Sequence, residues 1–319
     1  MNLIFPKVEL HCHLDGIVDR AMAWDIHRDD PHYPLDPREF ERAFPIGNDA
    51  ESFFKWWEFI EPIEGALENF YPIMDRHIER LKAQGVRYSE VMIGAGETVR
   101  DPVQAVEQVG AFREWVNAQE AGEIQVEFLI ALGRNKPLQA LKEAADKVLK
   151  LYEADLIAGV ALAGPEEGNP VKPLRKIFAR FHEAGLGIEI HAGEWCGPES
   201  IWDALEHGYP DRIGHGVSLF QDPKLLDLVR ERRMHVEMCP TSNLKTGSVS
   251  RMDEHPIGRA RELGLNFSVN TDDPGPFECS MASEYELLAD AFGFDEQDFE
   301  RVYVNSLGAR FRAELRVDV

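Results

Sequence analysis

Residues 8–16 read Val8-Glu9-Leu10-His11-Cys12-His13-Leu14-Asp15-Gly16, a short stretch that ends in a turn-forming pair. Its apolar residues alternate with more polar ones, which predicts a β-strand, and the Asp-Gly pair predicts the loop after it. Because side chains on a strand repeat every two residues, His11 and His13 point to the same face. Two imidazoles at a strand end suit a divalent metal such as zinc, although surface and core histidines without a metal produce the same pattern.

Beyond this strand, strands and helices alternate regularly along the chain. Further strands are predicted at residues 86–93, 124–132, 156–163, 187–191, 212–215, 235–239 and 266–270. Helices are predicted between them at residues 102–119, 137–153, 173–184, 199–207, 223–231 and 256–263. Such alternation requires parallel strands with right-handed crossovers, and eight units close into a (β/α)8 TIM barrel; an open doubly wound sheet is the alternative. A long helix at 66–84 and further helices after residue 270 are expected as additions.

An aromatic stretch at residues 51–60 lies near the N-terminus. On a helix, Phe53, Trp56 and Trp57 fall at positions i, i+3 and i+4 and share one face. This face either packs into the core or forms an apolar lid over a flat ligand.

Composition limits the possible partners and the compartment. The 319 residues carry a formal charge of −23, which argues against binding to nucleic acid or to an anionic membrane surface. Four widely spaced cysteines without a CxxC pair are typical of a reduced cytoplasmic enzyme. No signal peptide or long apolar run is found, and no Gly-rich nucleotide-binding loop follows a strand. We expect one cytoplasmic domain over residues 1–319, and the oligomeric state stays open.

Polar side chains collect at the ends of four predicted strands, the edge at which the active site of a barrel lies. Three imidazoles and one carboxylate could bind a metal and leave a position for water, as catalytic zinc requires; they are His11, His13, His191 and Asp272. Water bound to zinc ionises near neutral pH. Glu194 and His215 project into the same mouth, where they could move protons. One metal is favoured over two, because the fourth strand ends without a lysine or carboxylate to bridge a second ion.

Together these segments resemble the adenosine deaminase family of the amidohydrolase superfamily. The matching motifs occur in the family's order and are Pro6-Lys7-Val8-Glu9-Leu10-His11-Cys12-His13-Leu14-Asp15-Gly16, His191-Ala192-Gly193-Glu194, Arg212-Ile213-Gly214-His215-Gly216, Cys239-Pro240-Thr241-Ser242-Asn243 and Asn270-Thr271-Asp272-Asp273-Pro274. The resemblance implies a one-zinc hydrolase that replaces the 6-amino group of a purine nucleoside by oxygen and releases ammonia.

The resemblance also implies a role for each matching residue. The three histidines and Asp272 hold zinc, with Asp272 also among the catalytic residues. Glu194 protonates purine N1, and His215 orients and activates the attacking water. Asp273 meets N7, the backbone amide of Gly164 meets N3, and Asp15 binds the ribose 5′-hydroxyl.

The chain departs from the family pattern near the expected pocket wall. Ala161 replaces a usual Asp, Pro165 begins the segment where the family has Asp-Glu, and the second strand lacks the usual Glu-x-Arg. Asp15 favours a nucleoside over free adenine, since adenine deaminases of the family have Glu there. The alternatives are an adenine deaminase, an aminodeoxyfutalosine deaminase, a different amidohydrolase reaction with two metals, and a purine-binding protein without activity.

Overall fold

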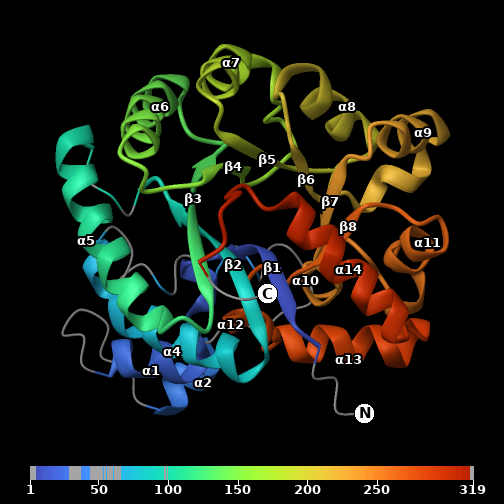
Figure 1. Ribbon diagram of the computed structural model, residues 1–319, viewed down its shortest axis with the longest axis horizontal. Coiled ribbons are helices and arrows are strands. Elements are labelled where there is room, and N and C mark those ends of the chain that lie inside the picture. The colour runs from blue at the N-terminus through green and yellow to red at the C-terminus, as the bar shows by residue number, and fades with distance from the viewer. Residues whose placement is uncertain are drawn as a thin grey trace.

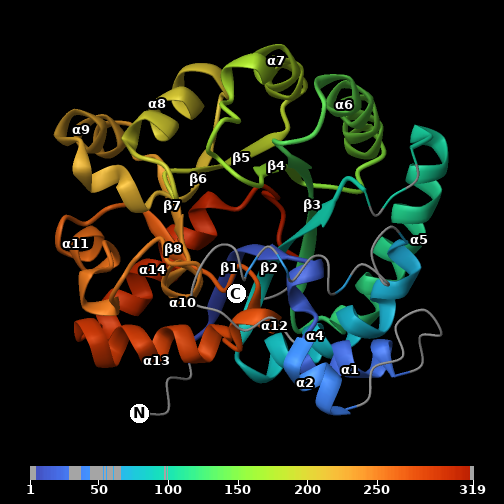
Figure 2. The same cartoon turned by 180° about the vertical axis from the view of Figure 1, so that it is seen from behind.

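The computed structural model describes residues 5–28, 37–43, 53, 55, 60, 66–96, 98 and 100–316. Eight parallel strands form one sheet in the order β1-β2-β3-β4-β5-β6-β7-β8, and helices surround it (Figure 1). The same ring is seen from behind in Figure 2. The predicted (β/α)8 barrel is therefore confirmed. The single-domain organisation stays a prediction.

The strands are β1 (Lys7–His13), β2 (Val86–Gly94), β3 (Gln125–Gly133), β4 (Gly159–Ala163), β5 (Gly187–Ala192), β6 (Arg212–His215), β7 (His235–Met238) and β8 (Phe267–Val269). The helices of the described part are α1 (Arg20–His27), α2 (Pro37–Ala43), α4 (Tyr71–Ala83), α5 (Pro102–Glu120), α6 (Leu138–Glu153), α7 (Arg175–Ala184), α8 (Pro198–His207), α9 (Pro223–Glu231), α10 (Pro240–Lys245), α11 (Ile257–Glu262), α12 (Pro274–Phe277), α13 (Met281–Phe292) and α14 (Glu296–Ala309).

Two elements differ from their predicted bounds for local reasons. The helix expected at 66–84 begins as a short 3-10 turn at Leu67–Phe70, and the α-helix starts only at Tyr71. The strand expected from residue 156 begins at Gly159. Leu156 still belongs to the turn that closes α6, because its N–H donates to the carbonyl of Leu151 at 3.0 Å.

Side-chain caps fix where several of the outer helices begin. Asp101 accepts hydrogen bonds from the amides of Val103 and Gln104, both at 3.0 Å, at the start of α5. Asp222 does the same at the start of α9. A proline follows each of these caps, at a position where a missing N–H costs nothing.

The barrel closes where the last strand meets the first. The amide of His13 donates to the carbonyl of Asp272 at 2.9 Å, and the amide of Asp272 donates to the carbonyl of His11 at 3.0 Å. Below them, the amide of Leu10 donates to Oδ1 of Asn270 at 2.9 Å. We call this closure, from residues 10–13 to residues 270–272, the β8–β1 seam.

Charged groups occupy part of the barrel interior. Arg212 is fully buried, and its guanidinium lies 2.5 Å from carboxylate oxygens of both Glu90 and Glu237. Phe311, in the segment after α14, stacks against it with the Arg212 guanidinium carbon 3.5 Å from the ring centroid. The C-terminal segment thus covers the face of the barrel opposite the site.

Ala161, expected near the pocket wall, does not itself line the cavity. It is fully buried and packs in an apolar cluster with Met92, Leu129 and Ala131 inside the barrel. Its register partner on β3, Ala131, does line the cavity, as do Ala163, Gly164 and Pro165 farther along the same chain segment as Ala161. The loop after β4 is the part that reaches the open end of the barrel.

Of the predicted aromatic face, Phe53 is within the described residues and helical, whereas Trp56 and Trp57 lie outside them. The ring of Phe53 packs against Phe277 of α12, with 5.1 Å between centroids. Throughout the described ranges, no helix combines the length and the apolar character needed to cross a membrane.

Candidate active site

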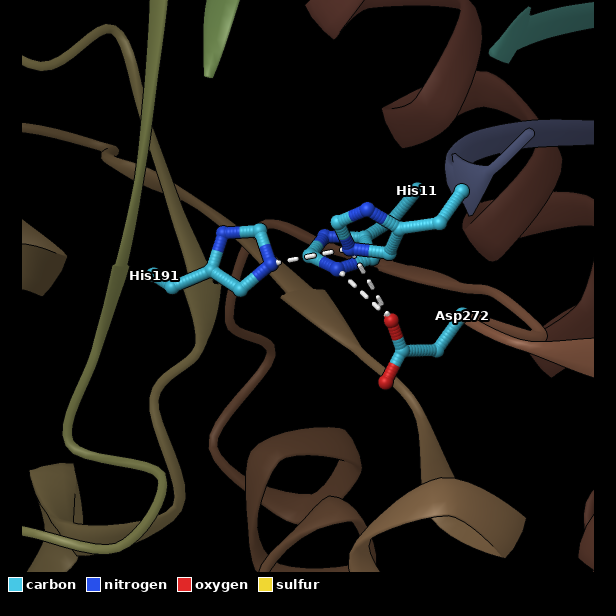
Figure 3. Close-up of side chains that lie close together, drawn as sticks. His11, His191 and Asp272 are labelled. Carbon is cyan, nitrogen blue, oxygen red and sulfur yellow. Dashed lines mark hydrogen bonds and ion pairs between the residues drawn. The ribbon is translucent and has the colours of Figure 1, made fainter. Parts of the chain in front are cut away.

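The four predicted metal ligands converge at the open end of the barrel. Figure 3 shows His11 from β1, His191 from β5 and Asp272, which follows β8, pointing toward one another. Oδ1 of Asp272 lies 3.3 Å from Nε2 of His11 and 3.3 Å from Nε2 of His13. Nε2 of His13 lies 3.2 Å from Nε2 of His191. Within the described part of the chain, no other group offers four such ligand atoms within 4.8 Å of one another.

A second set of side chains orients these ligands and was missed in the sequence. Nδ1–H of His11 donates to Glu237 at 2.7 Å, and Nδ1–H of His191 donates to Glu189 at 3.0 Å. Ser242 donates to Oδ2 of Asp272 at 2.6 Å. These three residues, His11, His191 and Asp272, therefore each turn their remaining atom, Nε2 or Oδ1, toward the common centre. Glu189 precedes His191 by two residues on one strand, so periodicity could have identified it.

The protonation of the ligands suits a cation. Burial lowers the pKa of His13 to about 4 and that of His191 well below its usual value, so both imidazoles are neutral. Burial would raise the pKa of Asp272, but the imidazole of His11, whose Nε2 lies 3.3 Å from Oδ1 of Asp272, and the other surrounding imidazoles hold this pKa below the usual range. His11 differs: burial disfavours its charge, yet the carboxylates of Asp272 and Glu237 outweigh this effect and raise its pKa.

This donor set fits a divalent metal ion. Three imidazole nitrogens and one carboxylate oxygen are ligands that zinc prefers, and the buried Nε2 of His11 has no hydrogen-bond partner in the described structure. The carboxylates of Asp272 and Glu237 favour a second proton on the His11 ring. A metal ion bound at Nε2 of His11 would replace that proton.

Glu194 is a buried carboxylic acid beside this centre. Burial raises the pKa of Glu194 well above its usual value, and the negative charges of Asp272 and Glu166 raise it further. Its Oε1 accepts a hydrogen bond from Thr246 at 3.4 Å, and its Oε2 lies 3.6 Å from Nε2 of His215. These effects favour the protonated form of Glu194, in which it can donate a proton.

A chain of hydrogen bonds fixes the tautomer of His215. The backbone N–H of Ile257 donates to Nδ1 of His255 at 3.1 Å, so the proton of neutral His255 is on Nε2 and goes to Oδ1 of Asn243 at 3.1 Å. The Asn243 amide then donates to Nδ1 of His215, also at 3.1 Å. Because burial lowers the pKa of His215 to about 3, its ring is neutral and its single proton is on Nε2.

Glu166 fixes the loop that carries Glu194. This buried carboxylate accepts hydrogen bonds from the amides of Gly193 at 2.7 Å, Glu194 at 2.8 Å and Trp195 at 3.0 Å, and a further one from the hydroxyl of Ser200. Nothing in the sequence pattern pointed to this role. Glu166 lies in the segment that departs from the family pattern, and its function depends on how two loops meet.

Asp273 and Gly164, to which the resemblance assigns contacts with the purine, both line the cavity at the open end of the barrel. Burial, followed by the charges of Asp272 and Asp15, raises the pKa of Asp273 well above its usual value, so its carboxyl group is protonated. Its Oδ1 has no hydrogen-bond partner among the described residues. Gly164 has φ of +94°, a left-handed conformation that favours glycine. Gly16 must lack a side chain because a Cβ there would collide with the Asp273 carboxyl group.

The site opens into one cavity of about 1100 Å³. It is lined by the ligands His13, His191 and Asp272 together with the other predicted site residues Asp15, Phe53, Gly164, Glu194, His215 and Asp273. The structure thus brings together every predicted site residue that it describes.

Comparisons with known proteins agree with this geometry. The family model described as adenosine deaminase matches residues 6–316. An adenine deaminase of Rhizobium leguminosarum bv. trifolii is 30% identical, over 98% of this chain and 96% of its own. An aminodeoxyfutalosine deaminase of Streptomyces avermitilis is 31% identical, over 96% and 86%. The crystal structure of an adenine deaminase from Arthrobacter aurescens shares the fold, with a TM-score of 0.83 at 24% identity over 98% and 95% of the two chains.

The family model matches nearly the whole chain, and the site residues expected for that family converge in one cavity. These two observations establish that the chain is related to the family. The chain belongs to the adenosine deaminase family and is a hydrolytic deaminase.

Proposed function

We propose that the protein hydrolyses the 6-amino group of an adenine nucleoside, with adenosine as the parent substrate, and that it does so with one zinc ion per chain. The observation that carries the proposal is the buried carboxyl group of Glu194, 3.6 Å from Nε2 of His215 and beside a ligand set of three histidines and one aspartate. Residues His11, His13, His191 and Asp272 would hold the metal. A bound zinc ion lowers the pKa of its water to about 7 and so supplies a nucleophile at neutral pH.

Glu194 supplies the proton that makes the purine reactive. Transfer of its proton to N1 removes aromatic stabilisation at C6, so that water adds there. Of the two protons of this water, one returns to Glu194 and the other goes to the 6-amino group. The C6–N bond then breaks to release ammonia, the C6–O bond becomes a carbonyl, and N1 keeps the proton that it received. The Nε2–H of His215 donates a hydrogen bond to the oxygen that attacks C6. In this tautomer His215 orients the nucleophile and stabilises its negative charge rather than removing its proton.

The remaining residues recognise the purine and the ribose. The protonated carboxyl group of Asp273 donates to N7, which has only a lone pair to offer. The amide of Gly164 donates to N3, and Asp15 accepts from the ribose 5′-hydroxyl. Phe53 contributes apolar surface at the cavity wall. The four free cysteines of the described structure favour a cytoplasmic location as part of the same proposal.

A screen of ammonia release tests this proposal. Adenine, adenosine, deoxyadenosine, AMP and aminodeoxyfutalosine are supplied separately, and metal content is measured on the same sample. We expect turnover of adenosine above that of adenine, with zinc near one ion per chain. Preference for free adenine, absence of ammonia from every compound, or zinc far from stoichiometric would contradict the proposal.

A second candidate is the deamination of an adenine nucleoside extended at its 5′ position. One of the relatives is named an aminodeoxyfutalosine deaminase, and the size of the cavity favours a ligand longer than adenosine. Pockets for drug-sized ligands have volumes of about 300–1,000 Å³, so a cavity of about 1100 Å³ leaves room beyond one nucleoside.

A further inference from the structure

Arg212 is a fully buried arginine that no proposed role above uses. It begins β6, inside the barrel, and it is not among the described residues that line the cavity. In the register of β5 and β6, Arg212 lies opposite Glu189, and Gly214 lies opposite His191. Arg212 is therefore two residues below the level of a metal ligand, in the layer that supports the ligands.

Glu237 connects Arg212 with one of these ligands. Oε1 of Glu237 lies 2.5 Å from Nε of Arg212, and its Oε2 accepts from Nδ1–H of His11 at 2.7 Å. The other ring nitrogen of His11, Nε2, lies 3.3 Å from Oδ1 of Asp272 at the common centre. A carboxylate held at both oxygens cannot rotate without losing one of its two contacts. The position of Arg212 therefore fixes the direction of Nε2 of His11.

The remaining contacts of Arg212 hold its guanidinium in place. One terminal nitrogen, Nη1, donates to the backbone carbonyl of Ala309 at 3.0 Å, and Nη2 donates to Glu90 at 2.5 Å. Oε1 of Glu90 in turn accepts from the hydroxyl of Tyr88 and from the amide of Phe311, both at 2.8 Å. The ring of Phe311 covers the guanidinium, with 3.5 Å from the guanidinium carbon to the ring centroid. Residues 309–311, at the end of α14 and just after it, thus hold Arg212 from the opposite end of the barrel.

The second supporting carboxylate, that of Glu189, has no such partner. It lies 2.9 Å from Nδ1 of His191 and 3.9 Å from Nδ1 of His11, and no arginine or lysine of the described ranges lies within 4.0 Å of it. A buried carboxylate is costly unless a cation pairs with it. Glu237 is therefore the supporting carboxylate that the barrel fixes through a buried cation, and His11 is the ligand that this cation orients.

We propose that Arg212 is a positioning residue for the metal centre, that it acts through Glu237 on His11, and that residues 309–311 support the centre through Arg212. This inference rests on the proposed function, because it concerns the metal which that function requires. Arg212 touches neither the metal ligands nor the cavity. Its loss should therefore change the affinity for metal and the orientation of His11, while KM of the metal-loaded enzyme stays close to that of the wild type.

The test measures the dissociation constant of zinc by competition with a chromophoric chelator. The proteins are the wild type, Arg212→Gln, Arg212→Lys and Phe311→Leu, and urea unfolding checks that each is folded. Arg113→Gln is the matched control. Arg113 is also buried, lies 3.4 Å from the carboxylate of Glu127 and covers the ring of Phe128 at 4.0 Å, but it contacts no metal ligand and no carboxylate that supports one in the described part of the chain.

We expect Arg212→Gln to weaken zinc binding by about tenfold or more, the usual effect of losing an outer partner of a metal ligand. Arg212→Lys keeps the charge, so its zinc affinity should lie between those of Arg212→Gln and the wild type. Phe311→Leu removes the ring that covers the guanidinium and should weaken zinc binding by about twofold or more. Arg113→Gln should lower stability but keep the zinc affinity within about twofold of the wild type, because it shares no partner with the metal centre.

A double-mutant cycle tests whether Arg212 acts through Glu237. In the background of Glu237→Gln the connection to His11 is already altered, so Arg212→Gln should change the zinc affinity by less than about twofold there. Additive effects of the two substitutions would contradict this route. An unchanged zinc affinity in folded Arg212→Gln, or an equal loss in Arg113→Gln, would overturn the proposal. If Arg212→Gln does not fold, wild-type zinc affinity in both Arg212→Lys and Phe311→Leu would overturn it.

NMR of the imidazole groups in the metal-free proteins separates this inference from the proposed function. The Nδ1 proton of His11, assigned with the variant His11→Asn, donates to Glu237 and should give a downfield signal in the wild type. Arg212→Gln or, if that variant does not fold, Arg212→Lys should shift this signal, and Arg113→Gln should leave it in place. If the wild type binds no zinc, the proposed function has failed, and the spectra still decide whether Arg212 orients His11. A signal that is the same in the wild type and the Arg212 variant refutes the inference.

Discussion

Replacement of Glu166 by glutamine tests whether this buried carboxylate sets both the position and the acidity of Glu194. Oε1 of Glu166 accepts from two amides and Oε2 from the amide of Gly193 and the hydroxyl of Ser200. Glutamine keeps one acceptor oxygen and carries an NH2 group in place of the other. Where the NH2 group replaces Oε2, it faces the N–H of Gly193, and two donors then point at each other. One charge-assisted bond is lost, a buried donor is left unsatisfied, and the remaining bonds lose their charge.

From these losses we expect Glu166→Gln to lower the free energy of unfolding by about 3–5 kcal/mol, since charge-assisted bonds contribute about 1.5–3 kcal/mol each and an unsatisfied buried donor costs about 1–3 kcal/mol. Domains of this kind are stable by about 5–15 kcal/mol, so the variant should still fold. Urea unfolding followed by fluorescence measures the change. Glu167→Gln is the matched control, because Glu167 is exposed and its side chain makes none of these contacts.

The pH profile of activity separates the electrostatic effect from the loss of stability. The negative charge of Glu166 helps to raise the pKa of Glu194, so its removal lowers that pKa. Glu194 acts in its protonated form, and activity is lost as pH rises through its pKa. The alkaline limb of kcat/KM should therefore move to lower pH in Glu166→Gln and stay in place in Glu167→Gln. Unchanged stability with an unchanged alkaline limb would refute this account of Glu166.

Other variants test the proposed chemistry more directly. His191→Ala should abolish activity and reduce bound zinc below stoichiometric, measured by metal analysis, and full zinc with full activity would show that the ligand assignment is incorrect. Glu194→Gln should lower kcat by about 10²-fold or more while substrate binding persists, and a rate within about threefold of the wild type would exclude the acid role. Asp15→Ala should remove a preference of about 10- to 100-fold for adenosine over 5′-deoxyadenosine in kcat/KM, and the absence of this preference in the wild type would contradict recognition of the 5′-hydroxyl. Asn243→Asp should force a proton onto Nδ1 of His215 and lower kcat by about 10²-fold with folding retained, whereas an unaffected kcat would argue against the tautomer assigned here.

The metal ligands could be inferred from the sequence because two simple rules place them. His11 and His13 are two residues apart on a strand, and strand ends in a barrel meet at one edge. Those rules require no knowledge of loop conformation. Glu189 obeys the first rule too, since it precedes His191 by two residues, and a search for carboxylates two residues from each ligand would have found it.

The roles of Glu166 and Asn243 could not be inferred in the same way. Each depends on how one loop packs against another, which hydrophobic periodicity does not specify. Ala161 is a further example: its strand was predicted, but periodicity alone did not show that its side chain packs in an interior cluster beside Ala131 and does not itself line the cavity.

The β8–β1 seam has a consequence for the order of events during biosynthesis. Cys12 and Asp272 pair across it, and the bond from Leu10 to Asn270 spans 260 residues of sequence. A chain that emerges from the ribosome carries His11 and His13 from the start, but it lacks Asp272 until most of the barrel has been synthesised. Contacts between such distant segments form late in folding. The proposed metal centre would therefore be completed last, when the barrel is almost finished, so a metal held by all four ligands would not guide the folding of the first half of the barrel.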